Sequence, residues 1–383
     1  MKIIIVLLMY GVETVIFLLE ERDKMENPKM IIDLEKFEKN VAFLVDKLSK
    51  QNLSITAVTK VVCAYPTLME VFDKFPEIEY FGDSRIENII SYQHSPKKKV
   101  LIRIPMHTEI EEVVKYADVS FNSEISTLRL LNEEAAKQGK THDVLLMTDL
   151  GDLREGLFYK EDLMNVVEII QTELSHLRLV GLGVNLTCYG GIIPDETNLS
   201  KLTEYKKEIE STYNIELPMI SGGNSSSLYL LDHPEEKLPE GITNLRVGES
   251  FYLGRETAYE ADYEEMFQDV FTLRTELVEL KIKPSYPIGK IGVDAFGNKP
   301  SFTDVGPILR GIAGIGKQDI SPDAITPIDE RIEIIGASSD HLIMDMTKTG
   351  KDYQVGSTID FKVDYGSLLS SFTSKYIKKE TIK

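Results

Sequence analysis

The chain has 383 residues, with 43 Lys and Arg against 62 Asp and Glu, so its formal net charge is 43 − 62 = −19. This charge argues against a nucleic-acid partner, because nucleic-acid binding requires clustered positive charge. With only two cysteines, Cys63 and Cys188, and no CxxC pair, the sequence predicts neither a disulfide framework nor a zinc site. We expect a cytoplasmic protein without a metal, long enough for one large barrel and a second, smaller domain.

The N-terminal segment, residues 1–27, is predicted to be a separate extension. Residues 3–19 are largely apolar, but Glu13 interrupts them, a charged stretch follows, and there is no small-residue cleavage site. A bilayer-spanning helix would have to bury Glu13, which is costly. We rank a spurious extension first, a peripheral helix second and a membrane anchor third, and expect no stable membrane association. Met25 is a candidate start, because a strand-like Met-Ile-Ile-Asp run begins at Met30.

From about residue 30 to 258, short apolar runs alternate with longer amphipathic stretches. In the stretch 34–50, for example, Phe37, Val41, Leu44 and Leu48 lie on one face at helical spacing. Eight strands alternating with helices predict an α/β fold, a parallel (β/α)8 barrel of the TIM type, over residues 28–258. The predicted strands are 55–61, 80–81, 100–104, 119–121, 144–149, 179–185, 219–220 and 244–247, and the predicted helices include 34–50, 67–75, 127–137, 160–173 and 199–213.

The pattern changes after Tyr259, where helical periodicity gives way to strand-like runs separated by Gly, Pro and Asp turns. We therefore predict a separate, mainly β domain over residues 259–383. Its predicted strands are 270–280, 308–315, 332–335, 342–346 and 358–363.

Lys60 closes the first predicted barrel strand, inside an otherwise apolar stretch. Barrel enzymes carry their reactive groups where strands end, so this position favours a chemical role. Burial lowers the pKa of a lysine, and a neutral amine is what Schiff-base formation with an aldehyde requires. The alternative is a lysine that extends from the strand end to solvent.

Two later segments suit anion binding at the same end of a barrel. The run Ser221-Gly-Gly-Asn-Ser-Ser-Ser227 offers hydroxyls and freely approached backbone amides to a phosphate, or it caps a helix with nothing bound. Arg246 ends the last predicted strand and could hold a phosphate, a carboxylate or a ring nitrogen, or form a structural ion pair. Gly248, two residues later, allows close backbone approach.

These segments, in this order, resemble those of the alanine racemase family of fold type III, and most closely its ornithine racemase branch. The resemblance runs from about residue 28 to 378. The matching stretches are Val58-Thr-Lys-Val-Val-Cys63, Gly82-Asp-Ser-Arg-Ile-Glu-Asn88, Val184-Asn-Leu-Thr-Cys-Tyr-Gly-Gly191, Ser221-Gly-Gly-Asn-Ser-Ser-Ser227 and Gly336-Ala-Ser-Ser-Asp-His341.

The resemblance implies an isomerase with pyridoxal 5'-phosphate as its cofactor, which Lys60 would hold as a Schiff base before serving as one catalytic base. Arg246 would face the pyridine nitrogen, and Asn185 occupies the place of a histidine that contacts the ring. The phosphate would be bound by Asn224, Ser225 and the backbone of Gly248 and Glu249.

The resemblance also implies a homodimer whose second domain completes the active site of the partner subunit. Arg154 matches an arginine near the substrate carboxylate, and Ser339 and Asp340 match a stretch that reaches this carboxylate from the second domain. The chain departs from the family at the second base: a tyrosine in a Gly-Tyr-x-Asp stretch is replaced by Lys317 in Gly316-Lys-Gln-Asp319. Lys317 is our candidate for this base, ahead of Tyr365 and His341; the alternatives for Lys317 are a carboxylate binder or a surface charge.

We expect a free amino acid as substrate, with ornithine first, then lysine, then alanine or serine. A cationic side chain would require carboxylates in the pocket, and Glu87, Asp152 and Glu155 are available without being assignable from sequence. One alternative is a diamino-acid decarboxylase of the same fold, but those enzymes use a Cys-x-x-x-Asp stretch and no cysteine follows Cys188. The other is a non-catalytic cofactor carrier, which would lack the β domain predicted here.

Overall fold

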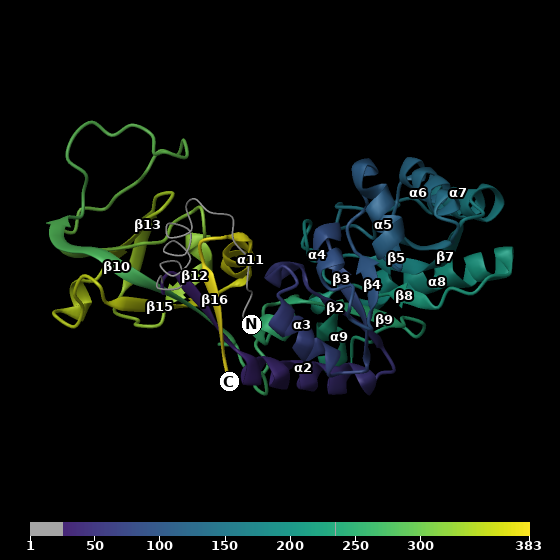
Figure 1. Ribbon diagram of the computed structural model, residues 1–383, viewed down its shortest axis with the longest axis horizontal. Helices are drawn as coiled ribbons and strands as arrows, with labels where there is room; N and C mark the ends of the chain where they lie inside the picture. The colour runs from purple at the N-terminus through teal and green to yellow at the C-terminus, as the bar shows by residue number, and fades with distance from the viewer. Residues whose placement is uncertain (1–25, 234) are drawn as a thin grey trace, which may run out of the picture. The chain divides into compact units, whose positions relative to one another are not determined.

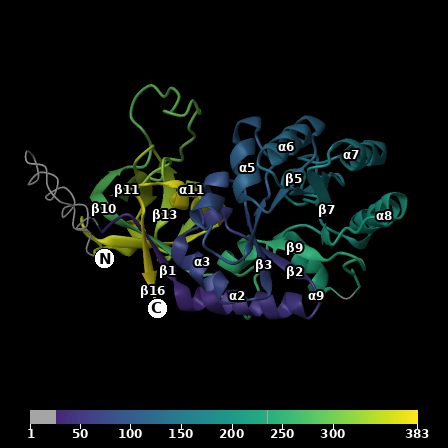
Figure 2. The same cartoon turned by 45° about the vertical axis from the view of Figure 1, so that its right-hand side comes forward.

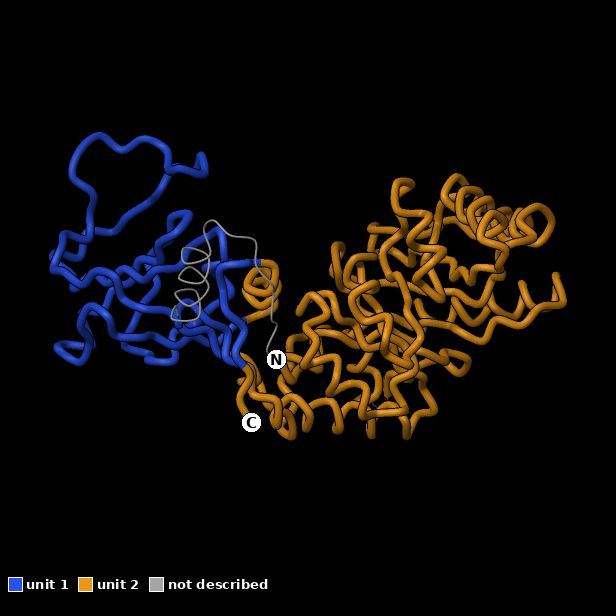
Figure 3. The backbone as a smooth tube through the Cα atoms, in the orientation of Figure 1, with its two compact units in different colours: residues 1–31, 272–363, 374–380 blue, residues 32–271, 364–373, 381–383 orange. Residues whose placement is uncertain are grey.

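The computed structural model describes residues 26–233 and 235–383, which form two compact units (Figure 3). The barrel unit comprises residues 32–271, 364–373 and 381–383, and the β unit comprises residues 272–363, 374–380 and the described residues before 32. The predictions for residues 1–25 lie outside the described residues. Among those described, no helix is both long and apolar enough to cross a membrane.

The barrel unit is built from eight strands that close into a parallel barrel in chain order, which confirms the predicted fold (Figures 1 and 2). Every predicted barrel strand corresponds to an observed one. The strands are β2 (Ser54–Val58), β3 (Ile78–Asp83), β4 (Lys98–Leu101), β5 (Val119–Asn122), β6 (His142–Thr148), β7 (Leu177–Val184), β8 (Met219–Ser221) and β9 (Asn244–Val247).

Helices connect the strands and cover the outside of the barrel (Figure 2). The first, α2 (Leu34–Ser49), begins where the Asp33 carboxylate accepts a hydrogen bond from Lys36 N at 3.0 Å. Its apolar face is buried, as the sequence pattern predicts. The other barrel helices are α3 (Pro66–Asp73), α4 (Ile86–Ser91), α5 (Ile110–Tyr116), α6 (Ile125–Lys137), α7 (Lys160–Glu173), α8 (Glu196–Tyr213), α9 (Tyr229–Asp232) and α10 (Glu249–Leu253).

The interior of the barrel is a packed apolar core, with Phe121, Leu145 and Met147 among its buried members. Two strands approach each other closely at Gly181, where a Cβ atom would lie 1.8 Å from the carbonyl oxygen of Met219. A larger residue at this position of β7 would therefore push β8 away and open the barrel wall.

The β unit is an antiparallel sheet in the order β12-β15-β10-β11-β14-β13, with β1 and β16 joined to it through β10. Alternate residues of the long strand β10, Leu273, Thr275 and Leu277, are buried. The strands are β1 (Lys29–Asp33), β10 (Phe271–Pro284), β11 (Pro307–Ala313), β12 (Ile325–Pro327), β13 (Glu333–Ala337), β14 (Leu342–Asp345), β15 (Thr358–Val363) and β16 (Lys378–Ile382).

The observed units differ from the predicted division into 28–258 and 259–383 in four places, two of which are that residues 259–271 and 381–383 belong to the barrel unit. Strand β1 pairs with β10 and β16, so residues 28–31 belong to the β unit. Helix α11 (Tyr365–Thr373), which the sequence pattern did not predict, belongs to the barrel unit and packs against the 3₁₀ turn that begins at Lys60. The placement of β1 depends on pairing with segments that are distant in the chain, which a local pattern does not record.

Candidate active site

A cavity of about 1000 Å³ lies at the carboxyl ends of the barrel strands. Residues that follow several strands contribute to its wall, including Lys60 after β2, Ser84 after β3, Ile102 after β4 and Asn224 after β8. This is the end of a (β/α)8 barrel that carries chemistry in known enzymes, so we treat the cavity as the candidate active site.

The cavity brings together every site residue predicted from the barrel part of the sequence. These residues are Lys60, Arg154, Asn185, Asn224, Ser225, Arg246, Gly248 and Glu249.

The remaining predicted site residues, Lys317, Ser339 and Asp340, lie in the β unit. There the backbone N–H of Lys317 donates to Ser338 O at 2.9 Å, and the N–H of Gln318 donates to Ser339 O at 3.0 Å. The Lys317 ammonium lies 4.2 Å from the centre of the Phe296 ring. The structure thus places the three residues on neighbouring segments of one unit.

Lys60 begins the 3₁₀ turn Lys60–Val62 directly after β2 and faces the cavity. Burial, reinforced by the charges of Arg154 and Arg246, lowers the pKa of Lys60. A larger fraction of Lys60 is therefore neutral than in an exposed lysine, and the neutral amine is the form that attacks an aldehyde.

The preceding residue, Thr59, links the start of this turn to the carboxyl end of β3. The Thr59 hydroxyl donates to the Asp83 carboxylate at 2.6 Å, and the same carboxylate accepts hydrogen bonds from Arg85 N at 2.9 Å and from the Asn88 amide at 3.0 Å. The motif at residues 82–88 thus fixes the backbone next to Lys60.

Arg246 is 4% exposed and is held by neutral groups. Its guanidinium donates to Ser221 Oγ and to Val184 O, each at 2.7 Å, and no carboxylate in the described residues forms an ion pair with it. Burial lowers the pKa of Arg246 to about 10. An ion pair within the described residues therefore does not explain why this arginine is buried, whereas an acceptor bound in the cavity would explain it.

The loops after β8 and β9 meet at Ser225, whose hydroxyl accepts hydrogen bonds from Gly248 N at 3.2 Å and from Ser250 N at 3.4 Å. The hydroxyls of Ser226 and Ser250 are buried and have no partner among the described residues. Unpaired buried hydroxyls are costly, so their position in these two loops fits a site that binds an oxygen-rich group such as a phosphate.

Asn185 connects the two arginines of the cavity. One polar atom of its side-chain amide lies 2.7 Å from the Arg154 guanidinium, and the other lies 3.3 Å from that of Arg246. The Asn224 amide donates to Leu186 O at 2.8 Å, next to Asn185. Arg154 also pairs with Glu155, so its guanidinium is held at the cavity wall.

Tyr365 also lines the cavity, although the sequence analysis considered it only as an alternative second base. It is the first residue of α11 and lines the cavity with Glu249. Burial raises the pKa of Glu249 to about 7, and burial together with the Glu249 charge raises the pKa of Tyr365 to about 12. Its place directly after the last predicted strand was the only available signal.

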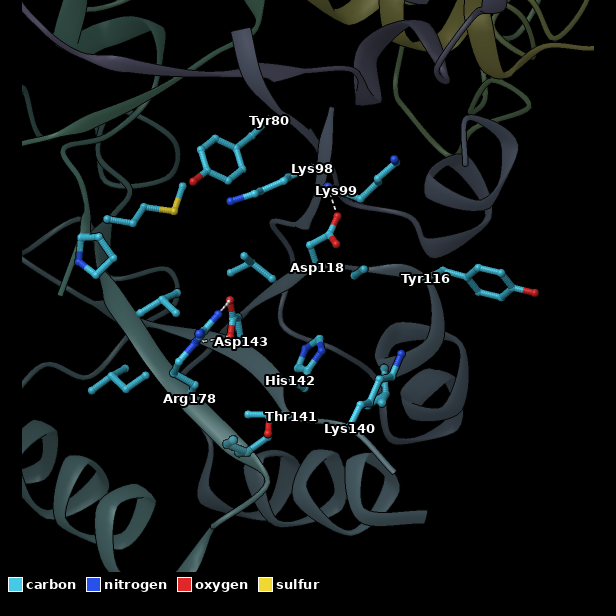
Figure 4. A pocket seen from close by; sticks show the side chains of 18 of the residues that line it. Tyr80, Lys98, Lys99, Tyr116, Asp118, Lys140, Thr141, His142, Asp143 and Arg178 are labelled. Atoms are coloured by element: carbon cyan, nitrogen blue, oxygen red, sulfur yellow. Dashed lines mark hydrogen bonds and ion pairs between the residues drawn. The ribbon is translucent and has the colours of Figure 1, made fainter. Parts of the chain in front are cut away.

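A second cavity, of about 890 Å³, lies at the opposite, amino-terminal end of the barrel strands (Figure 4). Two of its charged groups form an ion pair, since Arg178 donates to both Asp143 oxygens, at 2.7 and 2.6 Å, and the Asp118 carboxylate accepts a hydrogen bond from the backbone N–H of Lys99. Burial lowers the pKa of His142 to about 4, so this histidine is neutral. None of the predicted site residues lines this cavity, and its polar groups serve the structure of the barrel.

Within the part of the chain that the structure describes, there is no group of three or more His, Cys, Asp or Glu that could hold a metal ion.

The barrel fold and this cavity define a class, the (β/α)8 proteins with a polar, lysine-containing site at the carboxyl ends of the strands. The chain belongs to the alanine racemase family, because the family model "Alanine racemase, N-terminal domain" matches residues 32–256. It is 51% identical to the ornithine racemase of Acetoanaerobium sticklandii over 93% of this chain and 99% of that protein. It is 35% identical to the lysine racemase of Thermotoga maritima over 92% of this chain and 98% of that protein.

Solved structures show the same fold at low sequence identity. The alanine racemase of Streptomyces coelicolor A3(2) is 15% identical, with a TM-score of 0.70 over 94% of this chain and all of that one. The D-threonine aldolase of Filomicrobium marinum is 13% identical, with a TM-score of 0.68 over 91% and 89% of the two chains. Together with the family membership, the close relatives make this protein an isomerase, a pyridoxal-phosphate-dependent amino-acid racemase.

Proposed function

We propose that the protein interconverts the L and D forms of a free diamino acid, with ornithine as the principal substrate. The observation that carries this proposal is the partly buried lysine with a lowered pKa, Lys60, in one cavity with Arg246 and the serine-rich loop. The choice of ornithine is supported by the substrate of the relative that is 51% identical, and lysine is the second choice because another relative racemises it.

The residues of the cavity fit pyridoxal phosphate by their chemistry. When bound, this cofactor supplies an aldehyde for the substrate amine and a ring that stabilises negative charge at Cα. Lys60 Nζ would hold the aldehyde and then accept or return the proton at Cα. Arg246 would bind the ring nitrogen without giving up a proton, because guanidinium stays charged. Asn185 would contact the ring, and Asn224, Ser225 and the backbone of Gly248 and Glu249 would bind the phosphate.

Racemisation needs a proton donor on the other face of Cα, because the proton leaves one face and returns to the opposite one. We propose Lys317 for this role, and Arg154, Ser339 and Asp340 for binding the substrate carboxylate. Since Lys317, Ser339 and Asp340 belong to the β unit, we further propose a homodimer in which one subunit supplies them to its partner. We place the enzyme in the cytoplasm.

Replacing Lys60 with alanine tests the proposal. K60A should lose the visible absorbance of the lysine-bound cofactor and lose on the order of a hundredfold or more in the rate of racemisation of L-ornithine, followed by chiral chromatography. The matched control is K98A, because Lys98 lines the cavity at the other end of the barrel. A K60A protein that keeps its colour and activity would contradict the proposal. Release of carbon dioxide would indicate a decarboxylase instead, and absence of turnover in the wild type a carrier.

A further inference from the structure

A diamino acid carries a second ammonium group, and the structure narrows the choice of carboxylates that could bind it. Of the three carboxylates that the sequence offered, Glu87 does not line the cavity. Asp152 is 1% exposed and accepts hydrogen bonds from Tyr189 N at 2.9 Å and Ile192 N at 3.2 Å. Glu155 is paired with Arg154. None of these three is available to a substrate.

Two other carboxylates line the cavity, Glu249 and Glu260. Glu249 directly follows Gly248, on the side where we place the cofactor phosphate, and it is partly buried. Glu260 is exposed at the mouth of the cavity, and no Lys, Arg or His of the described residues forms an ion pair with it. Among the cavity carboxylates, Glu260 is thus the one that an incoming cation can reach without displacing a protein partner.

The loop that carries Glu260 is held in a fixed conformation by Glu256, which is 4% exposed. The Glu256 carboxylate accepts hydrogen bonds from the backbone of Ala258 at 2.6 Å, Tyr259 at 2.9 Å and Ala261 at 3.1 Å. The Tyr259 ring packs on Tyr229, with the ring centres 4.9 Å apart. The tip of the loop is therefore anchored on both sides of Glu260.

The backbone at Glu260 has a φ of 57°, in the left-handed region that residues other than glycine rarely adopt. Such a conformation costs free energy and persists where the surrounding structure enforces it, often at functional sites. The hydrogen bonds to Glu256 provide this enforcement, and the result is a carboxylate presented to the cavity.

We propose that Glu260 binds the distal ammonium group of the substrate and thereby selects diamino acids over uncharged amino acids. This inference rests on the proposed racemisation of a diamino acid. An ammonium group matches a free carboxylate in charge and donates hydrogen bonds to it.

The test is E260Q, which keeps the shape of the side chain and removes its charge. The matched control is E264Q, because Glu264 is exposed, lies four residues further along the chain and does not line the cavity. We expect kcat/KM for ornithine to fall on the order of tenfold or more in E260Q, mainly through KM. The value for norvaline, which has an uncharged side chain of similar length, should be unchanged. E260D should recover part of the loss for ornithine, because it restores the charge.

Equal losses for ornithine and norvaline, or no loss for either, would overturn the role of Glu260 and leave the proposed racemase intact. A different result would contradict both proposals. If the wild type and E264Q hold the cofactor but racemise only norvaline, then neither a diamino-acid substrate nor the role of Glu260 is correct. Cofactor absorbance equal to that of the wild type in all variants shows that the barrel is folded.

Discussion

Glu249 is a carboxyl group whose environment opposes its ionisation. Burial raises its pKa from 4.5 to about 7. Because the folded protein holds this proton more tightly than the unfolded chain, the contribution to the free energy of unfolding is complete below pH 4.5 and is lost as the pH rises through about 7. Above neutral pH, the charged Glu249 carboxylate in the cavity therefore lowers the free energy of unfolding.

We predict that the free energy of unfolding of E249Q, compared with that of the wild type, increases as the pH rises from about 5 to about 8. The relative change in the free energy of unfolding should be at most about 3 kcal/mol. Urea unfolding of the cofactor-free proteins at both pH values measures it. E264Q, which removes an exposed carboxylate outside the cavity, should show no comparable change. A difference between E249Q and wild type that does not depend on pH would refute this explanation.

The candidate residues at strand ends could be predicted because a barrel gathers the carboxyl ends of its strands. Lys60, Asn185 and Arg246 come from distant parts of the sequence, yet each lies at or near the carboxyl end of a strand that the hydrophobic pattern identifies. Tyr365 could not be placed in this way, because the helix that carries it follows a strand of the other unit. The free carboxylate of Glu260 was also missed, since only the structure shows which carboxylates already have partners.

At the scale of elements, the loop after β7 is organised by one buried carboxylate. Burial of Asp152 opposes its ionisation, but hydrogen bonds from the backbone of Tyr189, Ile192 and their neighbours outweigh this and lower its pKa. The loop includes Cys188 and Gly191, which line the cavity. At Gly190 a Cβ atom would lie 2.7 Å from Asp152 O, so the two segments are packed tightly together.

We predict that D152N loosens this loop, because the asparagine side chain places an N–H group against the backbone N–H donors. The free energy of unfolding should fall by about 1–3 kcal/mol, and the KM for the amino acid should rise. Urea unfolding and limited proteolysis near the exposed Tyr189 measure the two effects. The matched control is D162N on the outer face of α7, where the aspartate is exposed. Unchanged proteolysis in D152N would argue that the loop is held by other contacts.

The barrel elements could be predicted well because their periodicity is local and strong. The strand at residues 30–33 was also visible in the sequence, but its pairing with β10 and β16 was not, because pairing depends on segments hundreds of residues away. Helix α11 is short, and nine residues between two strands give little periodicity to detect.

At the scale of the whole molecule, the division into two units determines where the cofactor acts on stability. The residues proposed to bind pyridoxal phosphate, from Lys60 to Glu249, all belong to the barrel unit, whereas Lys317, Ser339 and Asp340 belong to the β unit. A ligand stabilises the structure that it binds, by about 2.7 kcal/mol at a concentration one hundred times its Kd. The cofactor should therefore protect the barrel unit first.

Amide hydrogen exchange measures this protection separately for each strand. Adding pyridoxal phosphate to the cofactor-free protein should slow exchange most in β2, β8 and β9, and less in β11 and β14 of the β unit, because local opening of the β unit leaves the proposed cofactor contacts intact. In K60A the slowing should be weaker in all five strands, since the covalent link is lost. If β11 and β14 gain as much protection as β2, the two units open together, and the cofactor stabilises a single cooperative structure in which both take part.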